Sequence, residues 1–116
     1  MGFTLVWTQK ARETYDRLKA DAISSLEARQ RKRKPKASQA EGLFKQVKKC
    51  VDFLKENPRH PGLSTHEFHS KEHPHTPGGK VFEAYIQQNS PGAYRLFWCY
   101  GPKKGEITII AITPHP

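Results

Sequence analysis

The stretch AYRLFWCYGPKKGEITIIAITPHP, residues 93–116, decides the fold of this chain. Residues 93–100 are apolar at almost every position, which predicts a strand that is buried on both faces near the centre of a sheet. GPKKG is a short turn, and EITIIAIT, residues 106–113, is the next strand. A connection this short joins antiparallel neighbours, so the two strands form a β-hairpin. Arg95 stands inside the first strand, and His115 follows the second.

The segment before this hairpin predicts a third strand. VFEAYIQ, residues 81–87, alternates between apolar and polar positions, and the NSPG that follows it has the composition of a turn. Its apolar side chains are expected to face the core. Glu83 and Tyr85 are expected to face outward, on an uncovered side of the sheet.

The first half of the chain predicts one strand and two helices. FTLVW, residues 3–7, has strand composition, and Thr8 can cap the helix that follows. Apolar residues then recur every three or four positions, which predicts an amphipathic helix over 9–30. SQAE, residues 38–41, is a capping box that opens a second amphipathic helix over 38–56.

These elements predict an α+β fold of order β-α-α-β-β-β, with two helices packed on one face of a small twisted antiparallel sheet. The 116 residues have room for a single domain, 1–116. A basic loop at 29–37 joins its helices, and an irregular His-rich loop spans 59–80. The sequence opens on no signal-peptide pattern and contains no apolar run as long as a membrane span, so a cytoplasmic protein without a membrane partner is expected. Cys50 and Cys99 lie in apolar patterns and are expected to be buried free thiols.

The positive charge of the chain is concentrated in its first half. The formal net charge is +9, and six of the ten residues in 29–38 are Lys or Arg. A basic surface of this kind attracts a polyanion, which is a nucleic acid, a membrane face or an acidic protein; the alternative is a solvated loop between helices. The residues expected to contact RNA are Arg29, Arg31, Lys32, Arg33, Lys34, Lys36 and Lys80.

The His-rich loop does not have the pattern of a metal site. It holds five histidines, but none of them lies in an HExxH spacing, no cysteine joins them, and prolines interrupt any helix. We therefore expect no metal and no cofactor. The loop either positions a nucleic acid or is an ordinary surface loop.

The order of elements, with YRLFWCY on the penultimate strand and TPHP after the last, resembles the RelE/ParE toxin superfamily of bacterial type II toxin–antitoxin systems. The resemblance implies a toxin that is neutralised by a cognate antitoxin, expected to be small and acidic. RelE-like members cleave mRNA on the ribosome, and ParE-like members poison DNA gyrase. Arg95 matches the strand arginine that contacts the scissile phosphate in RNA-cleaving members, and His115 matches a terminal histidine that some of them use for proton transfer. Those members carry basic residues on the preceding strand, where this sequence has Glu83 and Tyr85.

Metal-independent RNA cleavage needs a base for the 2′-OH, a cation for the phosphate and an acid for the leaving oxygen. The expected catalytic residues are Arg95 for the phosphate, His115 for proton transfer, and Glu83 or Tyr85 as a second proton-transfer group. In the non-catalytic alternative, Arg95 forms a structural ion pair with Glu83. The expected function is a ribosome-dependent mRNA endonuclease toxin. The alternatives are a gyrase-directed toxin of the same fold and a basic nucleic-acid-binding protein without toxicity.

Overall fold

The structure is a computed structural model that describes residues 2–88 and 91–114. Apart from one short additional strand, its helices and strands follow the predicted order and have the predicted α+β character. The elements are β1 (Thr4–Trp7), α1 (Gln9–Arg31), α2 (Gln39–Glu56), the 3₁₀ turn η1 (Pro61–Leu63), β2 (His66–Glu67), β3 (Phe82–Tyr85), β4 (Tyr94–Tyr100) and β5 (Glu106–Pro114).

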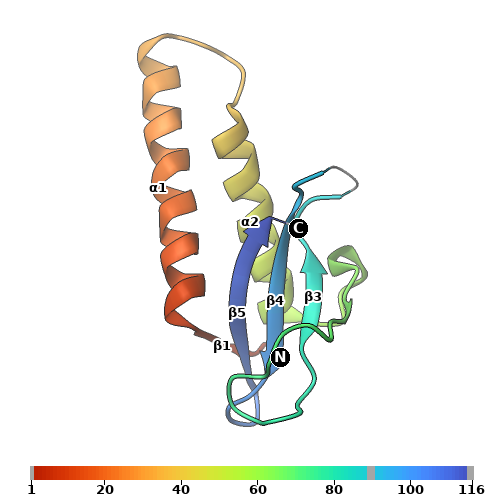
Figure 1. The fold of residues 1–116 in the computed structure, drawn as a ribbon. Coiled ribbons are helices and arrows are strands. Elements are labelled where there is room, and N and C mark those ends of the chain that lie inside the picture. The colour runs from red at the N-terminus through yellow and green to blue at the C-terminus, as the bar shows by residue number, and fades with distance from the viewer. Residues whose placement is uncertain (1, 89–90, 115–116) are drawn as a thin grey trace.

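The five strands form one sheet in the order β1-β5-β4-β3-β2, with β4 at its centre (Figure 1). The strands β3, β4 and β5 are consecutive antiparallel neighbours, as predicted. The sheet is mixed rather than wholly antiparallel, because β1 pairs in parallel with β5. This difference arises because the helical hairpin follows β1, so that the first strand is placed beside the last.

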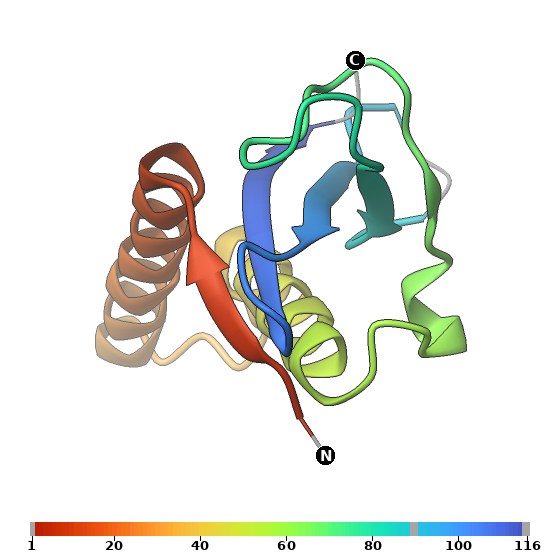
Figure 2. The same ribbon diagram turned by 90° about the horizontal axis from the view of Figure 1, so that it is seen from below.

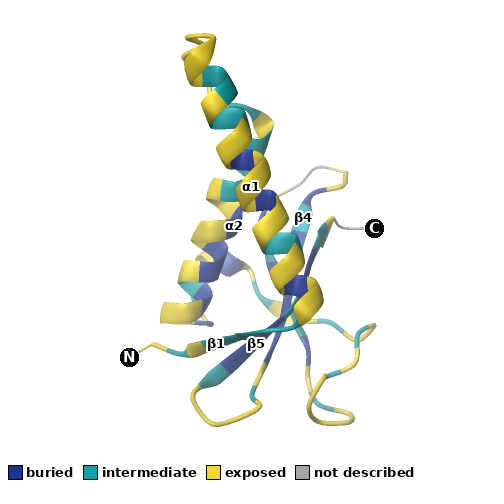
Figure 3. Ribbon diagram, turned by 90° about the vertical axis from the view of Figure 1, so that its left-hand side faces the viewer, coloured by how far each residue is buried: buried dark blue, intermediate teal, exposed yellow. Residues whose placement is uncertain are grey.

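The two helices begin at the caps that the sequence predicts. The Thr8 side chain accepts from the amide of Ala11, and Ser38 with Glu41 forms a complete capping box. Both helices turn their buried residues toward each other and toward the sheet, and their outer faces are exposed (Figure 3). Strand side chains such as Leu96 and Trp98 meet helix side chains such as Leu54 in this core.

A β-bulge interrupts the pairing of β4 with β5. Phe97 is opposite Ala111, but the next residue, Trp98, is opposite Ile109, so Ile110 is the extra residue. Thr8 holds this point, because its hydroxyl donates to the carbonyl of Ile110 at 2.7 Å. The cap of α1 therefore also fastens the bulge.

The face of the sheet away from the helices is partly covered, contrary to the sequence-based expectation. Figure 2 shows the segment between η1 and β3 crossing that side. The short strand β2 within it pairs with β3 and extends the sheet by one strand that the sequence did not predict. As a result Glu83, which was expected to be exposed, is 3% exposed.

Candidate functional site

Arg95 and Tyr85 face each other across β3 and β4, on the sheet face away from the helices. They are register partners, and the Arg95 guanidinium carbon lies 3.9 Å from the centre of the Tyr85 ring. Nη1 of Arg95 donates to the carbonyl oxygen of Gln87 at 2.6 Å and to that of Tyr94 at 3.2 Å. The cation is thus held in one orientation by a ring and by two backbone carbonyls.

Glu83 lies two residues before Tyr85 and shares its face of the sheet. Its register partners are Phe97 on one side and His66 on the other. Oε1 of Glu83 is 2.7 Å from Nε2 of His66, with the Glu83 side chain 4% exposed and that of His66 46% exposed. The ion pair between Glu83 and Arg95, which was the non-catalytic alternative, is not formed between these two described residues, because their register positions differ and the Glu83 carboxylate contacts His66.

These four residues make one group, which we call the polar cluster: His66, Glu83, Tyr85 and Arg95. The Tyr85 ring joins its two halves, since it contacts the Arg95 guanidinium on one side and meets the His66 ring edge-on at a centroid distance of 5.6 Å. Two of its buried atoms, Oε2 of Glu83 and Nε of Arg95, have no hydrogen-bond partner among the described residues. Buried polar atoms are nearly always paired in proteins, so an unpaired acceptor and an unpaired donor in one cluster suggest a place for a ligand or water.

The His-rich segment covers the neighbouring part of the same face. The Phe68 and Phe97 rings lie 4.7 Å apart, and Nε2 of His75 is 2.9 Å from the hydroxyl of Thr108. Nε2 of His73 is 3.1 Å from the carbonyl oxygen of Tyr100. Three contacts therefore fix this segment beside the polar cluster. In the described part of the chain, no three His, Cys, Asp or Glu side chains come together as a metal site would require.

Sequence reasoning placed three of the predicted catalytic residues correctly on one sheet face and missed one neighbour. Arg95, Tyr85 and Glu83 come together there, although Glu83 is buried rather than open. His115 lies outside the described residues. His66 was missed because a two-residue strand in a segment rich in proline and glycine gives no periodic signal. The sequence around it, THEF at residues 65–68, gave one indication of a strand, because threonine and phenylalanine favour strands.

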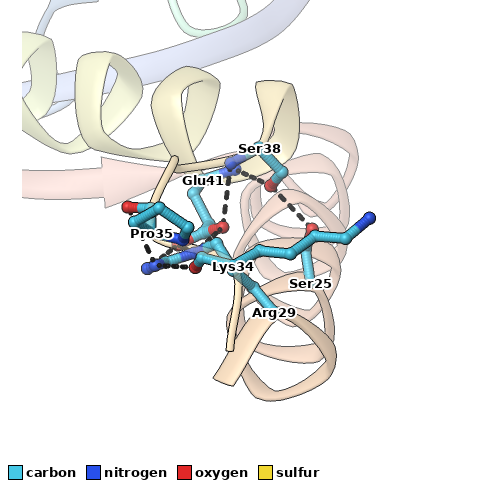
Figure 4. A network of polar contacts seen from close by, with 6 residues as sticks. All are labelled: Ser25, Arg29, Lys34, Pro35, Ser38 and Glu41. Carbon is cyan, nitrogen blue, oxygen red and sulfur yellow. Dashed lines mark hydrogen bonds and ion pairs between the residues drawn. The ribbon is translucent and has the colours of Figure 1, made fainter. Parts of the chain in front are cut away.

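The basic residues between the helices fall into two groups. Figure 4 shows the first, Arg29, beside Glu41 and Lys34. Arg29 is engaged: Nη2 donates to Oε1 of Glu41 at 2.8 Å, and Nη1 donates to the carbonyl oxygen of Lys34 at 3.1 Å. This contact, together with the Ser38 amide, lowers the pKa of Glu41 to about 2, and the same carboxylate raises the pKa of Arg29. The remaining basic side chains are exposed, and we call them the basic turn: Arg31, Lys32, Arg33, Lys34 and Lys36.

Lys80 and the two cysteines complete the predicted set. The Lys80 ammonium is exposed and lies 3.8 Å from a carboxylate oxygen of Glu67, at the edge of the His-rich segment. Cys50 and Cys99 are buried free thiols, as predicted. Burial raises the pKa of Cys50 to about 12 and that of Cys99 to about 11, which keeps both in the unreactive thiol form near neutral pH.

Comparison with known proteins gives a result at the level of structure. No family model matches the sequence, and no curated protein is significantly similar to it. A chain of the archaeal RelE–RelB complex from Pyrococcus horikoshii OT3 superposes with a TM-score of 0.56 at 13% identity, over 98% of this chain and 96% of that one. The YoeB dimer from Staphylococcus aureus gives 0.56 at 13% identity, over 98% of both chains. The chain has the fold of the RelE and YoeB toxins.

A third match extends the same conclusion. The YoeB/ParE toxin from Agrobacterium tumefaciens superposes with a TM-score of 0.52 at 14% identity, over 97% of this chain and 99% of that one. The RelE-like fold therefore spans nearly the whole sequence. One of these similar structures was solved with RelB and another as a dimer. Among the described residues no helix is long and apolar enough to cross a bilayer. Because one fold serves many activities, the activity has to be argued from the site.

Proposed function

We propose that this chain is a single-domain toxin of a type II toxin–antitoxin system, and that it cleaves mRNA on the ribosome. The observation that carries the proposal is the oriented cation Arg95, stacked on Tyr85 beside the buried carboxylate of Glu83, on a RelE-like sheet. A guanidinium fork is suited to a phosphate whose charge increases in the transition state. The exposed basic turn adds affinity for a polyanion.

The proposed reaction requires no metal. A base removes the proton of the 2′-OH, the 2′-oxygen attacks the neighbouring phosphorus, and the bond from phosphorus to the 5′-oxygen breaks. A 2′,3′-cyclic phosphate forms, and the leaving 5′-oxygen takes a proton from an acid. Arg95 holds the phosphate, His115 transfers one proton, and a second proton-transfer group is drawn from the polar cluster, to which Glu83 and Tyr85 belong.

The partners follow from the same proposal. The substrate is mRNA in the ribosome, and a cognate antitoxin, small and acidic, neutralises the toxin in the cytoplasm. The net charge of +9 suits an acidic partner as well as an RNA. Support for the antitoxin comes from the RelE-like fold, one member of which was solved as a RelE–RelB complex.

One observation favours a second candidate, a non-nuclease toxin of the same fold that acts on DNA gyrase. Arg95 is only 7% exposed, and the strand before it presents Glu83 and Tyr85 where RNA-cleaving members carry basic residues. A site with one deeply held cation offers less to a phosphate backbone than a site with several exposed cations.

Primer extension on a reporter mRNA after induction separates the two candidates. Wild type is expected to arrest growth and to produce new 5′ ends within codons of translated mRNA. Arg95→Ala is expected to reduce cutting by about 10²–10³-fold, because it removes the charge that stabilises the transition state. His115→Ala is expected to abolish cutting. Lys104→Ala, an exposed turn residue, is the control and should cut like wild type.

The outcomes decide between the proposals as follows. Growth arrest without new 5′ ends would reject the nuclease and favour the gyrase-directed toxin. Cutting retained by the folded Arg95→Ala and His115→Ala proteins would show that neither residue takes part in the chemistry. Far-ultraviolet circular dichroism of the purified variants, with thermal melts, establishes that each one is folded.

A further inference from the structure

We infer that His66 is a proton-transfer residue of this site and that Glu83 positions it, an inference that rests on the proposed nuclease function. The two side chains meet at 2.7 Å, from Nε2 of His66 to Oε1 of Glu83, across the pairing of β2 with β3. Glu83 is 4% exposed and His66 is 46% exposed at the side chain. The carboxylate of the pair is therefore buried, whereas the imidazole is accessible to solvent and substrate.

The geometry leaves one imidazole nitrogen only weakly engaged. Nε2 of His66 is occupied by the carboxylate, whereas Nδ1 makes a long contact of 3.4 Å with the carbonyl oxygen of Ser64. That distance is longer than an ordinary N–H···O hydrogen bond, so Nδ1 is not firmly committed. A carboxylate on one ring nitrogen fixes the ring orientation and stabilises the imidazolium that forms when the other nitrogen takes a proton.

The location also suits the reaction. The Tyr85 ring meets the His66 ring edge-on at 5.6 Å and stacks with Arg95 at 3.9 Å, so the imidazole and the guanidinium lie on either side of one ring. We place the phosphate of the nucleotide at Arg95 and its ribose on the His66 side of the Tyr85 ring. His66 combines an imidazole, the side chain most often used as a general acid or base, with a side chain that is 46% exposed.

The proposed step gives the residues separate tasks. Nδ1 of His66 accepts the proton of the 2′-OH as the 2′-oxygen attacks phosphorus, and the resulting imidazolium is balanced by the Glu83 carboxylate. The bond from phosphorus to the 5′-oxygen breaks, and that oxygen takes its proton from a second acid, the role proposed for His115. Glu83 is too deeply buried to reach the ribose itself. Its contribution to proton transfer therefore passes through His66.

A purely structural role for the pair predicts something different. In that case the ion pair would fasten the two-residue strand β2 to the sheet, and its loss would lower the melting temperature without any specific effect on the chemical step. The two roles are separable, because a small imidazole molecule can replace a missing catalytic side chain but cannot refasten a strand.

The experiment measures single-turnover cleavage of a defined mRNA in programmed ribosomes by purified full-length protein. His66→Ala is expected to cleave about 10²–10⁴-fold more slowly than wild type, the usual range for a general acid or base, and added imidazole is expected to restore part of the rate. Glu83→Gln is expected to lower the rate constant about 10–100-fold with little change in the half-saturating concentration, as loss of an orienting partner does. The double variant should be no slower than His66→Ala, because the two residues act as a unit.

His69→Ala is the matched control, since His69 lies in the same segment and its side chain is 82% exposed. It should cleave at the wild-type rate. His66→Asn retains a hydrogen-bond donor toward Glu83 and serves if the alanine variant does not fold. A folded His66→Asn or His66→Ala protein that cleaves at the wild-type rate would overturn the inference. An inactive His66→Ala protein that imidazole fails to restore, beside a fully active Glu83→Gln, would also overturn it. Absence of cleavage by wild type would reject the nuclease proposal itself, and with it this one.

Discussion

Removing the charge of the basic turn tests how this protein binds nucleic acid. The sequence alone counts six Lys or Arg residues in 29–36. The structure removes Arg29 from that count, because its guanidinium is bound by Glu41 at 2.8 Å and by two backbone carbonyls. Five exposed cations remain. The test variant therefore carries Arg31→Ser, Lys32→Ser, Arg33→Ser, Lys34→Ser and Lys36→Ser, and leaves Arg29 in place.

The magnitude follows from counterion release. Each phosphate contact on single-stranded nucleic acid contributes about 0.7 to the slope of log affinity against log salt, so five lost contacts reduce the slope by about 3.5. Between about 50 and 200 mM salt, wild type should then lose roughly 100-fold more affinity than the variant. Fluorescence anisotropy with a short single-stranded RNA, titrated at several KCl concentrations, measures both slopes.

Two controls separate the basic turn from general charge and from folding. Lys103→Ser with Lys104→Ser removes charge from the β4–β5 turn, which lies at the opposite end of the molecule from the helical hairpin tip (Figure 1), and should leave the slope unchanged. Arg29→Gln should also leave it nearly unchanged, because that cation is already neutralised by Glu41. A five-residue variant with the wild-type slope would refute the reasoning and identify the turn as a passive loop.

Two further predictions concern the helical hairpin and the thiols. The pKa of Glu41 falls from 4.5 to about 2 on folding, so its contribution to stability is present above about pH 4.5 and is lost as the pH falls toward 2. Urea unfolding should therefore give a higher free energy of unfolding for wild type than for Glu41→Gln at pH 6, and equal values near pH 2. A difference that is the same at both pH values would show that the ion pair does not stabilise the fold. Cys50 and Cys99, with pKa values raised to about 12 and about 11, should react with a thiol reagent at pH 8 only as fast as the protein unfolds. Rapid labelling of the native protein would contradict their burial.

The elements that the sequence predicted correctly are those with local signals. Thr8 and SQAE mark helix starts because their side chains satisfy free backbone amides within three residues. The turn at 101–105 requires a hairpin, because a connection of five residues is too short to join two neighbouring parallel strands. Each of these constraints acts over a few residues, so it can be seen without knowledge of the rest of the fold.

The features that the sequence did not predict depend on contacts between distant segments. Alternation in 81–87 shows that Glu83 and Tyr85 share a face, but nothing local shows that His66 will cover one of them and leave the other half-buried. In the same way, the basic run does not reveal that Arg29 is paired with a glutamate twelve residues later. Charge and periodicity identify candidate residues, whereas tertiary pairing decides which of them remain available.

The bulge in β5 links the core to the candidate site. Ile107 and Ile109 face the helices, and strict alternation would continue that face through residues 111 and 113. The extra residue, Ile110, shifts the inward and outward alternation of the side chains by one position. Ile112 therefore joins the core, and Thr113 becomes the register partner of Arg95. A small polar residue is therefore the register partner of Arg95, where unbroken alternation would have placed the bulkier Ile112. Thr8, the N-cap of α1, donates to the carbonyl oxygen of Ile110 at 2.7 Å. This hydrogen bond helps to keep the bulge in place, and the bulge determines which residue of β5 is paired with Arg95.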